Sequence, residues 1–311
     1  MDDLFGTYDD DADAEAAAVP RSKNCGVLKW HSPAAEEGLF VHLERHAQQC
    51  RGNPAETLRH VDIYATTKHW LMCIGPEKAQ ILEREALKPI VEARAAASSG
   101  AAPSQCLVVA ELGSYLGYSA VFLANTLLRL GVQRANLNVV SLEGDPLCVS
   151  WTRRMVDFCG CSDVVTVLHS TGAHAAALSR HLEASLTPNP NPNPNSDSNS
   201  STTPNPTPAP APAPTLDLLL IDHDTALYTS DLAAIESAGL LRPGSYVCAD
   251  NVLSFRKPLT EYLDHVRDTH RYASSRLFMS RIEYPDEPTN GAVGVEGEGD
   301  DVDGMEISVY L

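Results

Sequence analysis

The sequence predicts an α/β fold in which helices cover both faces of a mostly parallel sheet. From residue 107 onward, short apolar runs alternate with helical stretches, and the runs are apolar at every position rather than at every second one. A strand that is apolar on both faces has to be covered on both faces, which is typical of parallel sheets. We expect such strands at Leu107–Leu112, 139–142, 164–168, Leu216–Ile221 and 246–249.

Helices are expected before the first strand. The apolar spacing suits amphipathic helices at 42–49, 54–70 and 76–97, with Gly52-Asn53-Pro54 as the break between the first two. Residues 1–36 are acidic and rich in alanine, without sustained periodicity. We interpret them as a disordered leader, so that the domain begins at residue 37.

The end of the chain predicts a final pair of strands. Residues 276–283 and 305–311 have strand character, which brings the expected sheet to seven strands with an antiparallel C-terminal strand. Between them, 286–304 is an acidic, glycine-rich loop. Residues 188–214 form a Pro/Asn/Ala-rich run that cannot bury apolar surface, and we expect an extended surface insertion there. Strands lie on both sides of this insertion, so 37–311 is interpreted as one domain.

The formal net charge of −18 comes mainly from the two ends of the chain. Of the 41 acidic residues, seven lie in 1–16 and eight in 286–306, which leaves 26 against all 23 Lys and Arg. A near-neutral domain without a clustered basic face is not expected to bind nucleic acid.

Cysteine usage and hydropathy indicate the compartment. The eight cysteines show no CxxC spacing, which favours reduced thiols over a zinc site. The N-terminal segment has neither the basic start nor the apolar core of a secretory signal, and no run approaches the roughly 20 apolar residues of a membrane helix. We expect a cytoplasmic protein that does not bind membranes, with a monomer favoured.

A glycine-rich turn follows the first strand. In VVAELGSYLGYSA the strand ends near Glu111, turns through Gly113 and Gly117, and enters a helix at Ser119. Such a turn lets a ligand approach the backbone at the edge where open α/β sheets bind ligands. The next strand ends in Glu143, where a carboxylate can bind both ribose hydroxyls. The alternative is that both glutamates only cap helices.

Oxygen ligands follow two further strands. Asp222 comes after LDLLLI, and Asp250-Asn251 come after SYVCA. Two carboxylates and an amide at adjacent strand ends suit a hard cation such as Mg²⁺. Capping of the following helices is the alternative.

Five motifs in this order resemble the catechol O-methyltransferase family. They are IYATTKHWLMCIGPEKAQIL, ELGSYLGYSA, SLEGDP, LLLIDHD and CADN, and the resemblance runs from about residue 43 to 283 and again at DGMEISVY. It implies a Rossmann-like methyltransferase fold and transfer of a methyl group from S-adenosylmethionine to a hydroxyl of a catechol-like small molecule, with Mg²⁺ bound.

The resemblance also implies roles for individual residues. Asp222, Asp250 and Asn251 match the metal ligands, and Glu143 matches the ribose-binding acid. The residues expected around the rest of the cofactor are Met72, Ile74, Glu111, Gly113, Tyr115, Ser119, Asp222 and His223. Where the family has Ser-Gln to hold adenine, this chain has Gly172-Ala173.

One departure affects the chemistry. The family's general base is a lysine three residues after the first metal aspartate, and this chain has Thr225 there. Threonine cannot act as a base at neutral pH, and loss of a general base typically costs about 10² to 10⁴ in rate. Asp224 and Lys257 are candidates to replace it, although a solvated loop acid and a surface charge are the plainer interpretations. The remaining catalytic assignments are Asp222 and Glu283, which matches a glutamate that hydrogen-bonds a substrate hydroxyl.

The acceptor pocket has also changed. Trp70, Asn251, Phe255, Ile282 and Glu283 are expected to contact the substrate. A family tryptophan is replaced by Asp224 and a pocket proline by Phe255, which predicts one polar wall and a relocated aromatic ring.

Two other functions remain open from the sequence. A cofactor-binding protein with weak or no turnover would explain Thr225 and Gly172-Ala173. A nicotinamide dehydrogenase would use a similar sheet, but its ribose-binding acid should fall about 20 residues after the glycines, nearer than Glu143 does.

Overall fold

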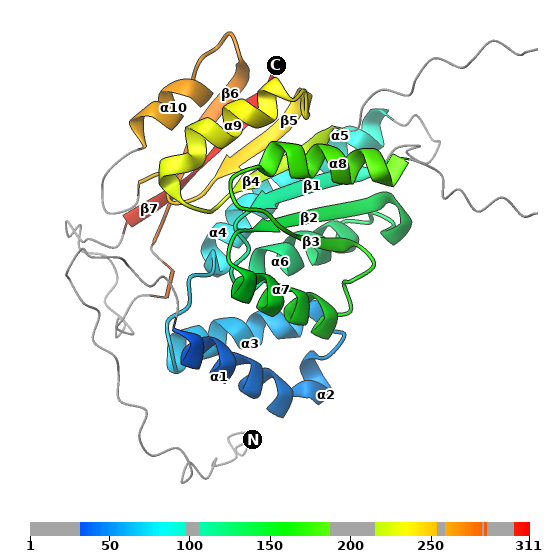
Figure 1. Ribbon diagram of the computed structural model, residues 1–311, viewed down its shortest axis with the longest axis vertical. Helices are drawn as coiled ribbons and strands as arrows, with labels where there is room; N and C mark the ends of the chain where they lie inside the picture. The colour runs from blue at the N-terminus through cyan, green and yellow to red at the C-terminus, as the bar shows by residue number, and fades with distance from the viewer. Residues whose placement is uncertain (1–31, 98–105, 187–214, 254–258, 282, 285–301) are drawn as a thin grey trace, which may run out of the picture.

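A seven-stranded sheet organises the described part of the computed structural model, which comprises residues 32–97, 106–186, 215–253, 259–281, 283–284 and 302–311 (Figure 1). The strands are β1 (Leu107–Leu112), β2 (Leu137–Glu143), β3 (Val165–His169), β4 (Leu216–Ile221), β5 (Leu241–Ala249), β6 (Tyr272–Arg281) and β7 (Val302–Tyr310). Their order is β3-β2-β1-β4-β5-β7-β6. The first five run parallel, and β7 is antiparallel to both β5 and β6. The predicted fold class is confirmed.

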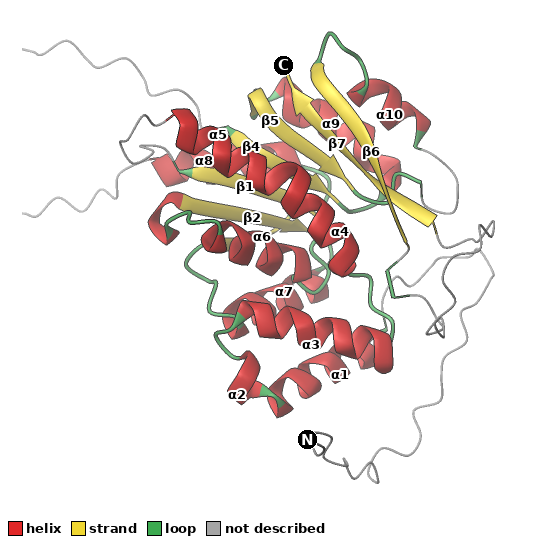
Figure 2. Ribbon diagram, turned by 180° about the vertical axis from the view of Figure 1, so that it is seen from behind, coloured by secondary structure: helices red, strands yellow, loops and turns green. Residues whose placement is uncertain are grey.

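Helices cover both faces of this sheet (Figures 1 and 2). The helices are α1 (Pro33–Arg45), α2 (Ala47–Cys50), α3 (Pro54–Thr67), α4 (Gly75–Leu82), α5 (Lys88–Ala97), α6 (Tyr118–Arg129), α7 (Pro146–Phe158), α8 (His174–Leu186), α9 (Tyr228–Ser237) and α10 (Thr260–Val266). A π-helical turn, Glu83–Leu87, joins α4 to α5. In the residues described, no helix is both long and apolar enough to cross a membrane.

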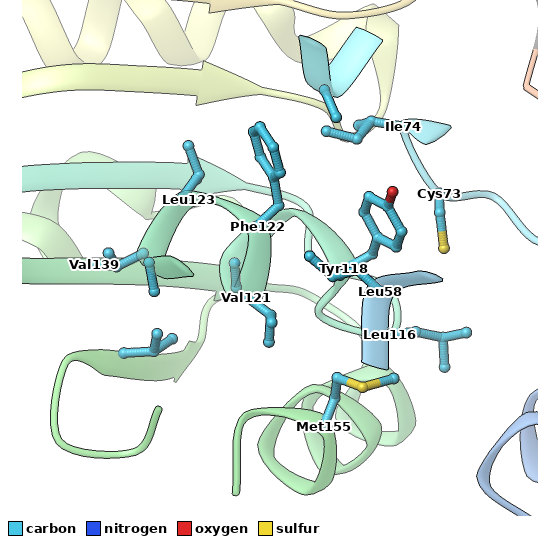
Figure 3. Packing of buried hydrophobic residues seen from close by; sticks show 14 of the residues in the cluster. Leu58, Cys73, Ile74, Leu116, Tyr118, Val121, Phe122, Leu123, Val139 and Met155 are labelled. Atoms are coloured by element: carbon cyan, nitrogen blue, oxygen red, sulfur yellow. The ribbon is translucent and has the colours of Figure 1, made fainter. Parts of the chain in front are cut away.

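Two apolar clusters fill the space on either side of the sheet. One packs α3 to α7 against one face, and it includes Leu58, Phe122, Val139 and Met155 (Figure 3). The other packs α8, α9 and α10 against the opposite face through side chains such as Leu178. Because consecutive residues of β1 belong to alternate clusters, its continuous apolar run is the expected pattern for a strand buried on both sides.

The strand register places the residues that follow the strands along one edge. Leu112 of β1 lies opposite Leu142 of β2 and Ile221 of β4, and Ile221 lies opposite Ala249 of β5. The chain therefore leaves all four strands at the same level, and the predicted polar residues follow directly. This edge is where open α/β sheets bind ligands.

The first helix begins earlier than expected. The sequence placed residues up to 36 in the leader, whereas α1 starts at Pro33. Proline fits the first turn of a helix because its missing N–H would have no partner there. Glu36 is buried and accepts hydrogen bonds from Ser32 N at 3.0 Å and from the Tyr115 hydroxyl at 2.6 Å. An acidic residue that belongs to the folded domain was thus counted with the tail.

Two strand boundaries also differ. β5 begins at Leu241 rather than 246, although it contains Pro243 and Gly244. Within β5, only residues 246–249 pair with β7, so no antiparallel partner requires the missing N–H of Pro243. β7 begins at Val302, inside the range expected to be an acidic loop, because the side chains of Asp303 and Glu306 have cationic partners, Lys78 and Arg267. The leader before residue 32, the 188–214 insertion and most of the acidic loop lie outside the described residues.

Candidate functional site

A glycine allows the turn after β1 to pass close to the end of β4. Gly113 has φ +90, and a Cβ atom there would lie 2.1 Å from the carbonyl oxygen of Asp222. Any side chain would therefore force the two strand ends apart, in addition to the strain of a positive φ. The turn that the sequence singled out is fixed in contact with the first predicted metal ligand.

Backbone amides hold the carboxylate of Glu143 in place. Its Oε2 accepts from the N–H groups of Ser114 and Tyr115 at 3.0 and 2.9 Å, and more weakly from Ser114 Oγ at 3.4 Å. Its Oε1 accepts from Gly144 N and Asp145 N at 2.7 and 2.9 Å. Glu143 thus positions the glycine turn as well as lying where a ribose was expected. A ribose hydroxyl would most readily replace the long Ser114 Oγ contact.

Glu111 is buried with one oxygen uncompensated. The Ser141 hydroxyl donates to its Oε1 at 2.6 Å. Its Oε2 is buried without a hydrogen-bond partner among the described residues. Burial raises the pKa of Glu111 to about 7. A carboxylate in this state fits a cationic group such as the ammonium of a methionine moiety.

The other predicted cofactor residues surround this turn. Ile74 is buried and Met72 half-buried just before α4. Tyr115 has φ +48 and is tied to Glu36 through its hydroxyl. His223 stacks on Tyr228 and contacts Asp231 Oδ2 through Nε2 at 2.7 Å. At the predicted adenine position, Gly172 and Ala173 are exposed and have no polar side chain to offer.

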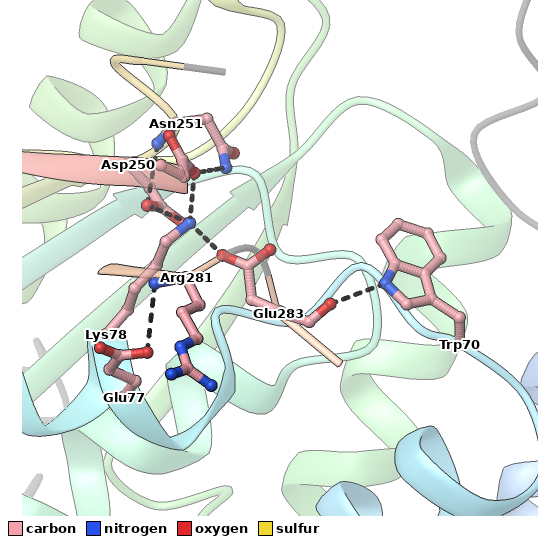
Figure 4. Close-up of polar contacts among 8 residues, drawn as sticks. Trp70, Glu77, Lys78, Asp250, Asn251, Arg281 and Glu283 are labelled. Carbon is pink, nitrogen blue, oxygen red and sulfur yellow. Dashed lines mark hydrogen bonds and ion pairs between the residues drawn. The ribbon is translucent and has the colours of Figure 1, made fainter. Parts of the chain in front are cut away.

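A buried ammonium joins the acidic residues beyond β4 and β5. Lys78 of α4 contacts Asp250 Oδ1 at 2.7 Å and Asp303 Oδ2 at 2.6 Å, and it also pairs with Glu283 (Figure 4). We call Lys78, Asp222, Asp250, Glu283 and Asp303 the acid cluster. The side chains of Lys78, Asp250 and Asp303 are at most 2% exposed. The cluster therefore connects α4, the end of β5, β7 and the residue that follows β6.

Asn251 closes this cluster on the sheet side. Its Nδ2 donates to Asp303 Oδ2 at 2.7 Å, and its backbone N–H donates to Asp250 Oδ1 at 2.8 Å. Its φ is +54, a left-handed conformation that asparagine adopts more readily than most residues. The predicted triad of Asp222, Asp250 and Asn251 thus lies at two adjacent strand ends, as expected.

The acid cluster has more carboxyl groups than cationic side chains. Burial and the nearby charge of Asp250 raise the pKa of Asp222 well above its ordinary value. Burial also raises the pKa of Asp250, against the opposing effect of Lys78, and raises that of Glu283 to about 7. Burial disfavours the charge on Lys78, but the surrounding carboxylates more than offset this and raise its pKa.

These properties fit a divalent cation. Three carboxylates contact one ammonium, Asp222 is a fourth carboxyl group within its electrostatic influence, and one oxygen of Asp303 is buried without a hydrogen-bond partner in the described part of the chain. All the available ligands are oxygens, which is the donor set that Mg²⁺ prefers.

The predicted substrate residues are only partly described. The Trp70 side chain is 40% exposed, and its Nε1 donates to the backbone oxygen of Glu283 at 2.9 Å. A cavity of about 360 Å³ opens beside Glu283 and is also lined by Ile74, Gly75 and Tyr284. Phe255, Lys257 and Ile282 lie outside the described residues.

Thr225 begins a short 3-10 turn, Thr225–Leu227, three residues after Asp222. Asp224 caps this turn by accepting from Ala226 N at 3.0 Å, and it is exposed. The plainer interpretation of Asp224, a loop acid, matches this geometry. Its carboxylate is engaged by the backbone of its own turn rather than directed at the acid cluster.

Sequence reasoning missed Lys78 and Asp303. Lys78 is the most buried residue of the acid cluster, and it lies in GPEKAQIL on the same face of α4 as the buried Ile81 and Leu82. A lysine at a position where the helical period predicts an apolar residue is a signal that could have found it. Asp303 carried no such signal, because its glycine-rich and acidic neighbours looked like a loop.

Comparison with known proteins identifies the family. The chain is 30% identical over 249 residues to catechol O-methyltransferase of Bos taurus, which covers 80% of this chain and 72% of that one. The chain belongs to the catechol O-methyltransferase family. It is also 27% identical over 297 residues to catechol O-methyltransferase B of Danio rerio, covering 92% and 87% of the two chains. No family model matches.

A solved structure shares the fold of the present chain. The O-methyltransferase from Bacillus cereus in complex with SAH superposes with a TM-score of 0.50 at 15% identity, covering 83% of this chain and 90% of that one. The fold is thus that of the S-adenosylmethionine-dependent O-methyltransferases.

Proposed function

We propose that this O-methyltransferase transfers the methyl group of S-adenosylmethionine to one hydroxyl of a catechol-like acceptor, with a divalent cation at the acid cluster. The observation that carries this proposal is the excess of carboxyl groups over cationic side chains next to a preformed glycine turn. Asp222 belongs to both parts, because its backbone touches the turn and its side chain belongs to the cluster. The cofactor and the acceptor would therefore meet at Asp222.

The cofactor supplies a methyl group on a positively charged sulfur. We assign Glu111 to the ammonium of its methionine part, because the free Oε2 has no other partner among the described residues. Glu143 is assigned to the ribose, and Met72, Ile74, Tyr115 and Ser119 to the surrounding walls. His223 is assigned to the adenosine side. Gly172 and Ala173 have no polar side chains, so adenine would receive no side-chain hydrogen bonds from these two residues.

Asp222, Asp250 and Asn251 would hold the divalent cation, which supplies positive charge that lowers the pKa of a bound acceptor hydroxyl. Lys78 fixes Asp250 and Glu283 relative to each other. Glu283 would accept a hydrogen bond from the second hydroxyl of the acceptor. Trp70, Phe255 and Ile282 would wall the aromatic ring and exclude water from the reacting atoms.

Thr225 makes the rate depend on the acceptor's own ionisation. An ordinary phenol has a pKa near 10 and is a poor nucleophile at neutral pH. Because Thr225 cannot remove the proton, the hydroxyl has to be deprotonated before it reacts. We expect kcat to rise with pH until the bound hydroxyl is fully ionised.

The test is a methyl-transfer assay with labelled S-adenosylmethionine and a panel of vicinal diols, with and without a chelator. Labelled product is expected from a catechol in Mg²⁺, with a loss of about 100-fold or more in EDTA and in Asp222→Asn. Asp264→Asn, an exposed acid on α10, is the matched control and should match the wild type. If the wild type in EDTA and the Asp222→Asn variant in Mg²⁺ were both as active as the wild type in Mg²⁺, the proposal would be overturned.

Restoring a base gives a second test of the same site. In Thr225→Lys, kcat at neutral pH should rise by about tenfold or more, because a positioned base contributes about 10² to 10⁴. Its dependence on pH should also become flatter. If the variant folds and binds the cofactor but gains nothing, the acceptor hydroxyl does not lie near residue 225.

A further inference from the structure

Three histidines meet between α1 and α3, away from the acid cluster. His42 and His46 lie four residues apart at the C-terminal end of α1, and His60 lies on the neighbouring helix α3. The two helices lie side by side in both views (Figures 1 and 2). The ring centroids are 4.7 Å apart for His42 and His46, 4.5 Å for His46 and His60, and 5.3 Å for His42 and His60.

One pair of nitrogens in this histidine cluster already has the separation that a metal would give it, and the third nitrogen is close by. One ring nitrogen from each residue lies within 4.8 Å of those from the other two. His42 Nε2 and His60 Nδ1 are joined by a hydrogen bond of 3.2 Å, whose proton a bound metal would replace. Two imidazoles on one tetrahedral Zn²⁺, at bond lengths near 2.0 to 2.1 Å, would hold their nitrogens about 3.3 Å apart. Only a small adjustment of the rings would therefore be needed.

We propose that His42, His46 and His60 form a binding site for a transition-metal dication of the Zn²⁺ type. His42 in the last turn of α1 and His46 at its C-cap lie four residues apart and have adjacent rings. His60 supplies the third nitrogen from a buried position, 5% exposed, while His42 and His46 are half-buried and give access from solvent. Three imidazoles and no carboxylate select Zn²⁺, Ni²⁺ or Cu²⁺ over Mg²⁺.

The residues around the histidine cluster both favour and oppose metal binding. Burial and the neighbouring histidines lower the pKa of His42 to about 4, so protons do not compete for its ring at neutral pH. The C-terminal end of α1 carries partial negative charge, which favours a cation. Against this, Arg45, Arg59 and Lys68 are close enough to act on the cluster. Arg59 Nη2 lies 3.3 Å from His60 Nε2, but Arg59 is 53% exposed and pairs with Glu56.

A bound metal would join α1 to α3. α1 also carries Glu36, which accepts a hydrogen bond from Tyr115 in the glycine turn. The metal site would therefore stabilise the helix that supports this turn, without contributing a group to the methyl transfer.

Zn²⁺ binding to the metal-stripped full chain tests the proposal. Calorimetric titration with Zn²⁺ should show one equivalent that Mg²⁺ does not displace, and X-ray absorption should show a nitrogen shell near 2.0 Å. His60→Asn and His46→Asn should each weaken this binding by more than about tenfold. His270→Asn, an exposed histidine on the far side of the sheet, and Asp222→Asn should retain it.

The variants also separate this site from the acid cluster. Loss of the Zn²⁺ equivalent in Asp222→Asn, with retention in His60→Asn, would mean that the ion belongs to the carboxylates and would overturn the proposal. Unchanged binding in both histidine variants would do the same. If His60→Asn misfolds by circular dichroism, His46→Asn decides the question, because His46 is half-buried at a helix end.

Discussion

The cofactor end and the acid cluster differ in what compensates their carboxyl groups. At the cofactor end, Glu143 already accepts hydrogen bonds from four backbone N–H groups, and Glu111 is raised to a pKa of about 7, so that it is readily neutral. In the acid cluster, burial likewise raises the pKa of Glu283 to about 7 and that of Asp222 well above its ordinary value, and a single ammonium serves four carboxyl groups. The first region is organised before any ligand binds, whereas a further cation would allow all the carboxyl groups of the second region to be charged.

Removing Lys78 should lower the free energy of unfolding more than any other change, because the carboxyl groups of the acid cluster would then have no cationic partner in it. In Lys78→Met the buried carboxylates lose the ammonium that pairs with them, and breaking a buried ion pair from one side typically costs about 3–5 kcal/mol. Urea denaturation measures the free energy of unfolding. Lys88→Met, at a 58% exposed position 4.0 Å from Glu92, should change it by less than about 0.5 kcal/mol.

Mg²⁺ sharpens this prediction. It should recover part of the loss in Lys78→Met, because a dication can compensate the same carboxylates. A Lys78→Met variant as stable as the Lys88→Met control would show that the cluster is not charged as described.

Glu111 should make stability depend on pH at the cofactor end. Its pKa is about 7 in the folded protein against an ordinary value of 4.5. Its contribution is therefore complete below about pH 4.5 and lost as the pH rises through 7. Relative to Glu111→Gln, the wild type should lose up to about 3 kcal/mol between pH 4.5 and 8.

The cofactor product offers the matched condition for this titration. SAH carries the ammonium assigned to Glu111, and a saturating concentration should reduce the difference between the two proteins at pH 8. Parallel stability curves for wild type and Glu111→Gln would place the titration elsewhere.

Alanine substitutions at two glycines distinguish the cost of a positive φ from the cost of a steric clash. Gly113 and Gly244 have nearly the same φ, +90 and +89, but only Gly113 has backbone atoms where a Cβ would go. Gly244→Ala should cost about 1 kcal/mol for the positive φ alone. Gly113→Ala should cost more, about 2–3 kcal/mol, and should weaken SAH binding in calorimetry. If the two substitutions lowered the free energy of unfolding equally, the clash with Asp222 would be relieved at little energetic cost.

Trp70 should give the smallest effect. Trp70→Phe keeps an aromatic wall and removes the hydrogen bond to the Glu283 backbone, which is worth about 0.5–1.5 kcal/mol. The acceptor KM should rise by a few fold with kcat nearly unchanged. A large fall in kcat would instead indicate that this bond positions Glu283 for the reaction.

The sequence predicted the cofactor end better than the acid cluster, for a physical reason. Glycines, strand ends and Glu143 act through local backbone geometry, and local geometry leaves a pattern in the sequence. Lys78 and Asp303 act through a contact between residues 225 positions apart. Such a pairing depends on how β7 inserts between β5 and β6, which periodicity does not reveal.

The same contrast explains the errors at element boundaries. Glu36 and Asp303 were assigned to the acidic leader and the acidic loop because charge usually marks solvent-exposed chain. Each is buried and hydrogen-bonded to a distant residue. The pocket residues Phe255 and Ile282 lie outside the described part of the structure, so their roles stay predictions.

Calorimetric titration of SAH and then of a catechol, in EDTA and in Mg²⁺, tests most directly whether the cofactor end is preorganised while the acid cluster requires a cation. SAH should bind with the same affinity in both conditions, within about threefold, and the catechol should bind more than about tenfold more tightly in Mg²⁺. If the catechol binds as tightly in EDTA as in Mg²⁺, the acid cluster does not require a cation. If SAH itself requires Mg²⁺, the cofactor end is not preorganised.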